Sequence, residues 1–131
     1  MQNKVLLLHC AEGARKALNK MSNKGYKLKP SIYTFELSCM GRVNEVMLMQ
    51  VLEQDFSGVL LVACHKDNCQ YLQGNLRAEK RLIRLKNMLA EAGITDKKLG
   101  IIFVAPDEAQ KLELEIEAFL KNGNTRVATK A

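Results

Sequence analysis

Four cysteines are the residues in this chain whose type and spacing can support chemistry. Cys64 and Cys69 are separated by four residues, and they follow directly on an apolar run at residues 58–63. Cys10 and Cys39 also come just after strand-like runs. Converging thiolates share the positive charge of a bound metal, so four of them can hold zinc, a 2Fe–2S cluster or a 4Fe–4S cluster. The cysteines predict such a site if the fold brings them together.

Two other interpretations of the cysteines stay open at this point. Free cysteine is among the residue types most often buried, so all four can be structural thiols. Cys64 and Cys69 can also form a redox dithiol, although the usual dithiol spacing is C-x-x-C and this interpretation leaves Cys10 and Cys39 unexplained. The C-x4-C spacing itself occurs in plant-type 2Fe–2S ferredoxins, within a longer motif that this chain lacks.

Three neighbours of the cysteines are candidates for tuning such a site. Gly41 permits a tight loop whose N–H groups can point at the sulfurs. Arg42 can place a positive charge beside an electron-rich cluster, or it can be an ordinary surface arginine. His65 can be a ligand, but we favour a loop histidine that bonds to the backbone.

The composition is that of one ordinary globular domain. The chain has 131 residues, of which 26% are charged and 47% hydrophobic. No apolar run approaches the length of a membrane span, and no signal peptide is recognisable, so a cytoplasmic location is expected. In that reducing compartment the four cysteines are not expected to form two structural disulfides.

The net charge of +6 raises the question of nucleic-acid binding. Only 5% of the residues are aromatic, and no DNA- or RNA-binding motif is present, so no nucleic-acid partner is expected. We interpret the charge mainly as a solvated surface, and secondly as a docking site for an acidic protein. The basic residues concentrate at Arg77, Lys80, Arg81, Arg84 and Lys86.

No serine–histidine–acid set, phosphate loop or carboxylate pair stands out in the sequence, so no catalytic residue is assigned.

Short apolar runs alternate with segments that carry apolar residues at three- and four-residue spacing, which predicts strands and helices in turn. Asn44 is the predicted N-cap of the second helix, and Gly93 is the predicted residue that ends the third. Strands are predicted at residues 4–9, 31–37, 58–63 and 99–104. Helices are predicted at residues 14–22, 45–53 and 73–92, and from 106–107 to 123.

This alternation predicts an α/β fold, a flavodoxin-like or Rossmann-like three-layer domain with a four-stranded parallel sheet. The domain is expected to cover residues 1–123, with a frayed tail at 124–131. The strands are apolar throughout, as expected when both faces of the sheet are covered. Sites in such sheets form outside the carboxyl ends of the strands, where all four cysteines would meet.

Several segments of the sequence resemble one known family, the delta subunit of methyl-viologen-reducing hydrogenase. The segments are CMGRV at residues 39–43, GVLLVACHKDNCQY at 58–71, Gly74-Asn75 and AEKR at 78–81. The resemblance implies a small subunit that carries a 2Fe–2S cluster. It also implies that the subunit passes electrons between a hydrogenase or formate dehydrogenase and the flavin-containing A subunit of heterodisulfide reductase.

By this resemblance Cys39, Cys64 and Cys69 fall on family cysteines, and Cys10 falls near a cysteine-rich segment. Members of the family commonly carry several cysteines in that segment, whereas this chain has only Cys10. Residues 66–68 also depart from the family, whose members tend to carry proline and glycine there. The leading hypothesis is a non-catalytic electron-transfer subunit with one 2Fe–2S cluster held by the four cysteines. The alternatives are a cluster-free or zinc-binding interaction module of the same fold and, ranked last, a thiol-dependent enzyme or redox sensor.

Overall fold

Four strands and four helices alternate along the chain in the computed structural model. The structure describes residues 4–10, 13–26, 28, 31–37, 43–54, 56–64, 74–94, 96–105 and 107–122. The strands are β1 (Lys4–Cys10), β2 (Ile32–Leu37), β3 (Phe56–Cys64) and β4 (Lys98–Val104). The helices are α1 (Gly13–Asn23), α2 (Glu45–Leu52), α3 (Gly74–Glu91) and α4 (Ala109–Asn122).

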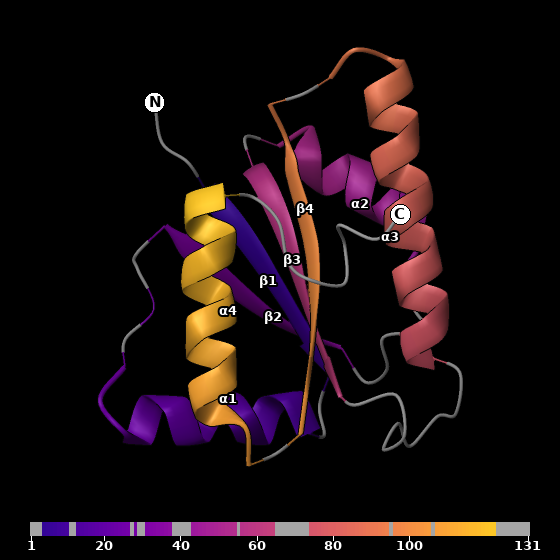
Figure 1. Cartoon of the computed structure of the whole chain (residues 1–131). Coiled ribbons are helices and arrows are strands. Elements are labelled where there is room, and N and C mark those ends of the chain that lie inside the picture. The colour runs from indigo at the N-terminus through magenta and orange to yellow at the C-terminus, as the bar shows by residue number, and fades with distance from the viewer. Residues whose placement is uncertain are drawn as a thin grey trace.

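The strands form one parallel sheet in the order β2-β1-β3-β4. Helices α1 and α4 pack on one face of this sheet, and α2 and α3 pack on the other (Figure 1). From β1 the chain first adds β2 on one side, and it then adds β3 and β4 on the other side. The position between β1 and β3 is therefore the topological switch point of a flavodoxin-like strand order. The predicted three-layer fold with a four-stranded parallel sheet is confirmed.

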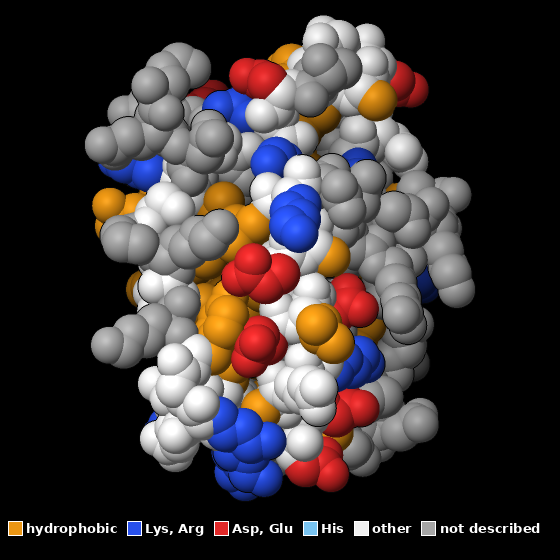
Figure 2. Space-filling view, turned by 60° about the vertical axis from the view of Figure 1, so that its left-hand side comes forward, with side chains coloured by type: hydrophobic (Ala, Val, Ile, Leu, Met, Phe, Trp, Pro, Cys, Tyr) orange, Lys and Arg blue, Asp and Glu red, His pale blue; other side chains and the backbone are white. Residues whose placement is uncertain are grey.

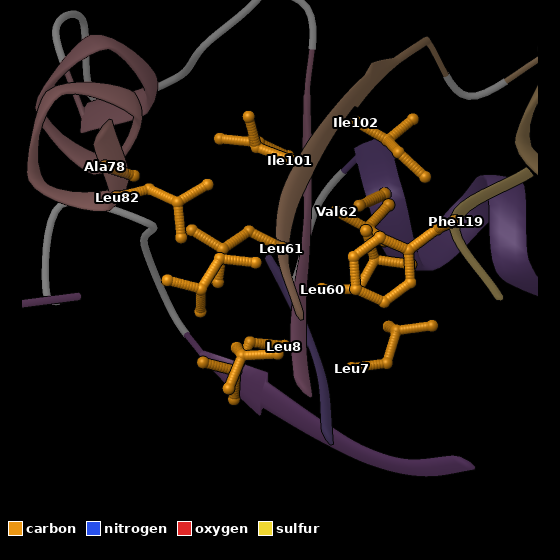
Figure 3. Close-up of a cluster of buried hydrophobic side chains, with 14 of the residues drawn as sticks. Leu7, Leu8, Leu60, Leu61, Val62, Ala78, Leu82, Ile101, Ile102 and Phe119 are labelled. Carbon is orange, nitrogen blue, oxygen red and sulfur yellow. The ribbon is translucent and has the colours of Figure 1, made fainter. Parts of the chain in front are cut away.

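The core lies on both faces of strands β1, β3 and β4. On one face Leu7 and Leu60 lie beside Phe119 of α4, and on the other Leu61 lies beside Leu82 of α3 (Figure 3). Alternate residues of a strand point to opposite faces, so a strand that is covered on both sides must be apolar throughout. This requirement explains the apolar runs in β1, β3 and β4.

Strand β2 departs from the expectation that every strand is covered on both faces. Tyr33 and Phe35 are 48% and 57% exposed, although each pairs with a residue of β1. Strand β2 is at the edge of the sheet, and α2 and α3 contact β3 and β4 instead. The aromatic content of β2 therefore reflects its β-propensity more than its burial.

Two helix ends are formed by the predicted residues. The side chain of Asn44 accepts a hydrogen bond from the N–H of Met47 at 2.9 Å, which makes Asn44 the N-cap of α2. Gly93 has a φ of +79°, in the left-handed region that favours glycine after a helix. Both predictions are confirmed.

Two boundaries differ from the prediction by two residues or more, and the other described boundaries differ by at most one residue. Strand β3 begins at Phe56 and not at residue 58, because Phe56 already pairs with Lys4. Helix α4 begins at Ala109, two residues after the predicted start. Before it, Glu108 folds back on Ala105, accepting the N–H of Ala105 at 2.8 Å through its carboxylate and donating its own N–H to the carbonyl of Ala105 at 3.1 Å. The predicted end at residue 123 and the predicted tail lie outside the described residues.

The close approach of β3 and β4 depends on a glycine. A Cβ atom at Gly58 would lie 2.8 Å from the carbonyl oxygen of Lys98, which is tighter than real side chains allow. Gly58 and Lys98 are partners in the parallel ladder. Glycine therefore allows the first pair of the ladder between β3 and β4 to form. In the described part of the chain, no helix has the length and apolar character needed to cross a bilayer.

A hydrogen bond joins the loop after α1 to α4. The hydroxyl of Tyr26 donates to the carboxylate of Glu117. Burial, and then this carboxylate, raise the pKa of the Tyr26 phenol. The folded chain therefore holds the phenolic proton more tightly than the unfolded chain. The stability that Tyr26 contributes through its raised pKa is complete below the phenol's unfolded pKa of about 10. It is lost as the pH rises towards the higher pKa of the folded state.

Replacing Tyr26 with phenylalanine tests this bond. We expect the free energy of unfolding of Tyr26→Phe at neutral pH to fall by about 0.5–1.5 kcal/mol, because one hydrogen bond is lost. Above about pH 10 the variant should lose stability less steeply than the wild type. Urea unfolding at a series of pH values measures both effects, and parallel curves for the two proteins would contradict the assignment.

Candidate metal centre

Two of the four cysteines end neighbouring strands. Cys10 is the last residue of β1, and Cys64 is the last residue of β3. Because His9 pairs with Val62 in a parallel ladder, the two strands finish at the same edge of the sheet. This edge is the carboxyl edge, beside the topological switch point, where ligands bind in sheets of this kind.

The thiol of Cys10 is buried and free, with 4% of the residue exposed. Cys10 is two residues from Leu8 along the strand, so both side chains belong to the face that α2 and α3 cover. Cys10 is also part of the hydrophobic core. A buried thiol at a strand end can serve as a ligand or as a small core residue, and the two roles predict different results on mutation.

The other predicted site residues are not placed by the structure. Cys39, Gly41, Arg42, His65 and Cys69 lie outside the described residues. Among the residues that are described, no group of three or more histidine, cysteine or acidic side chains is arranged to hold a metal ion. The four-cysteine site therefore stays a prediction. Strand β2 does end at residue 37, two positions before Cys39 and in register with Cys10.

Two arginines of α3 hold the start of α2. The Nη1 group of Arg81 donates to the carbonyl oxygen of Val43 at 2.5 Å. The Nη1 group of Arg84 lies 2.7 Å from the carboxylate of Glu45. A hydrogen bond to its own backbone N–H, and then Arg84, hold the pKa of Glu45 below its usual value. These bonds connect the segment that follows Cys39 to the helix that follows Cys69.

The basic residues of α3 are evident in the sequence, but these two contacts are not. Arg81 and Arg84 lie 38 and 39 residues from their partners. No local pattern indicates a pairing over that separation. The only available signal was the concentration of arginine and lysine in one segment.

His9 is a buried histidine with a hydrogen-bond partner at the end of β1. It is 8% exposed, and its Nδ1 donates to the carbonyl oxygen of Cys10 at 3.2 Å. His9 points to the face opposite to that of Cys10, where it lines a groove of about 440 Å³ beneath α1. Arg15 and Glu36 lie 3.8 Å apart in this groove and balance each other's charge. No sequence pattern indicated this groove, because its lining comes from three separate elements.

One protein family matches almost the whole chain. Residues 5–123 match the sequence model of the family described as methyl-viologen-reducing hydrogenase, delta subunit. The match extends from β1 to the end of α4 and includes all four cysteines.

Proteins of two kinds are among the relatives of this chain. The first kind is the iron-sulfur D subunit of F420-non-reducing hydrogenases. The protein of this name from Archaeoglobus profundus is 24% identical over 107 residues, which are 82% of this chain and 78% of that protein. The corresponding vhc protein of Methanococcus voltae is 27% identical over 85 residues, 65% of this chain and 59% of that protein.

The second kind is a much longer protein. The A subunit of the ferredoxin/F420H2-dependent CoB-CoM heterodisulfide reductase of Methanosarcina acetivorans is 31% identical over 91 residues. The match covers 70% of this chain but only 12% of that protein. Sequence of this kind therefore occurs both in short subunits and within a larger chain.

Proposed function

The chain belongs to the methyl-viologen-reducing hydrogenase delta subunit family, and on that premise we propose that it is an electron-transfer subunit with one 2Fe–2S cluster. Cys10, Cys39, Cys64 and Cys69 would hold the cluster at the carboxyl edge of the sheet. The cluster would supply one-electron chemistry when bound. The protein would bind it, shield it and bring it close to a cofactor in each of two partners.

The observation that carries the proposal is the ending of β1 and β3 in cysteine at one edge of the sheet. The donor set also suits the cluster, since four thiolates are the usual ligands of a 2Fe–2S centre. Cys10 is a free thiol and is therefore available for ligation. The remaining two cysteines follow β2 and precede α3 in the sequence.

The names of the relatives support the proposed partners. One kind of relative is called an iron-sulfur subunit of a hydrogenase, and the other is named as the A subunit of a heterodisulfide reductase. We propose that this chain relays electrons between a hydrogenase or a formate dehydrogenase and a flavoprotein subunit like that of heterodisulfide reductase. Related sequence forms a separate subunit in some proteins and part of the heterodisulfide reductase A subunit in others. A domain of this kind is well suited to bind next to such an A subunit.

The test is a metal and sulfide analysis of anaerobically purified protein, with visible and EPR spectra. We expect about two iron atoms and two acid-labile sulfides per chain, and a rhombic EPR signal after reduction. Zinc without sulfide would support the alternative of a zinc-binding interaction module. Neither metal nor sulfide after anaerobic reconstitution would support a cluster-free module. That alternative is motivated by the presence of only one cysteine, Cys10, in the segment where family members commonly carry several.

The variant Cys10→Ala separates the ligand role of Cys10 from its core role. A ligand role predicts the loss of most of the iron on reconstitution. Because only one sulfur atom leaves the core, the metal-free variant should unfold with a free energy only about 1 kcal/mol below that of the wild type. Iron analysis and urea unfolding measure the two effects. Full iron content in a correctly folded variant would show that Cys10 is a core residue only.

A further inference from the structure

Helix α3 has a basic outer face in its first half. Its inner face is formed by apolar residues that are buried against the sheet. Arg77, Lys80 and Arg84 are exposed and recur at spacings of three and four residues, so they lie along one side of the helix. We call these three residues the basic face of α3. The buried residues of the inner face are Ala78, Leu82, Leu85 and Leu89.

The basic face is connected to the predicted cluster site by short stretches of sequence. Arg84 reaches Glu45 at the first turn of α2, and the neighbouring Arg81 reaches the carbonyl oxygen of Val43. Val43 is four residues after Cys39, and α3 begins five residues after Cys69. An extended chain advances at most about 3.6 Å per residue, so both cysteines are connected to this face by short segments. Figure 1 shows α3 beside α2, on the far side of the sheet from α1 and α4.

We propose that the basic face of α3 is the docking site for an acidic surface of an electron-transfer partner protein. This inference rests on the proposed function, since a cluster near one edge of the sheet is useful only if a partner binds close to it. Complementary charge accelerates the encounter of two proteins and favours one orientation. None of the ion pairs between described residues involves Arg77 or Lys80.

The surroundings of the basic face favour a protein over a nucleic acid as the occupant. The carboxylate of Glu45 lies within this surface, bound to Arg84, and would repel a phosphate backbone. Two exposed apolar side chains are close in sequence to the residues of this surface. Val46 directly follows Glu45 on α2 and is 67% exposed, and Met88 is one turn after Arg84 and 48% exposed. Arginine and methionine beside exposed apolar surface are characteristic of protein interfaces.

The experiment compares two charge-reversal variants with the same net charge. The double variant Arg77→Glu/Lys80→Glu changes the basic face, and the control Lys16→Glu/Lys20→Glu changes two exposed lysines of α1 on the opposite side of the sheet. The probe is a fluorescently labelled oligoglutamate peptide, whose binding to the full chain is measured by anisotropy at low salt. A labelled oligothymidylate of the same length is measured in parallel. Circular dichroism verifies that both variants fold.

We expect the α3 variant to bind the peptide at least about tenfold more weakly than the wild type, and the α1 control to change by less than about twofold. Equal weakening in both variants would overturn the proposal, because it would show an effect of net charge alone. Tighter binding of oligothymidylate than of the peptide, lost in the α3 variant, would overturn it in favour of a nucleic-acid site. Peptide binding needs no cluster, so this result is independent of iron and sulfide content, which tests the proposed function separately.

Discussion

Replacing Cys64 with serine is expected to remove most of the iron and acid-labile sulfide that the wild-type chain takes up on anaerobic reconstitution. Cys64 is the last residue of β3, beside the end of β1 and at the topological switch point of the sheet. A serine hydroxyl stays protonated at neutral pH, so it cannot supply the negative charge that a thiolate gives to iron. Iron and sulfide analysis together with the visible spectrum measure the loss.

The control for this variant is the residue paired with Cys64 in the neighbouring strand. Val104 ends β4, pairs with Cys64 and is fully buried. Val104→Ala disturbs the packing at the same edge of the sheet without removing a sulfur, and it should keep its iron and sulfide. Wild-type spectra for Cys64→Ser would show that Cys64 is not a ligand. Equal losses in both variants would show that the site depends on packing at this edge and not on this thiol.

The order of the elements could be predicted because burial leaves a strong local signal. Strands β1, β3 and β4 are covered on both faces and are therefore continuous apolar runs. Strand β2 was also predicted, but most of its residues are exposed. Its position at the edge of the sheet depends on how the chain crosses over, and the sequence of β2 alone does not contain that information.

The candidate site could be predicted only as far as the topology determines it. Cysteines after successive parallel strands must come to one edge, and Cys10 and Cys64 do so. The bond from Arg81 to the carbonyl of Val43 depends on the packing of α3 beside α2. The groove beneath α1 likewise requires side chains from β1, α1 and β2 to meet. Such contacts follow from tertiary packing, for which a single sequence gives no periodic pattern.

Replacing Phe119 with alanine is expected to give the largest loss of stability among these variants. Among the residues that the structure describes, Phe119 is the largest fully buried side chain, and it packs from α4 onto the face of the sheet that carries Leu7 and Leu60 (Figure 3). Removal of the ring leaves a cavity that the surrounding leucines can fill only in part. The free energy of unfolding should therefore fall by about 3–5 kcal/mol, measured by urea denaturation of the metal-free chain.

The matched control is an exposed residue of the same helix. Leu114 is 63% exposed, and in the space-filling view α4 presents a surface on which charged side chains are mixed with a few apolar ones (Figure 2). Leu114→Ala keeps the helix propensity of α4 high and should change stability by no more than about 0.5 kcal/mol. A loss below about 1 kcal/mol for Phe119→Ala would contradict the packing of α4 on the sheet. Helix α4 follows β4 and covers the face of the sheet opposite to α3. A large loss of unfolding free energy for Phe119→Ala, with none for Leu114→Ala, would show that burial against the sheet holds α4 in place.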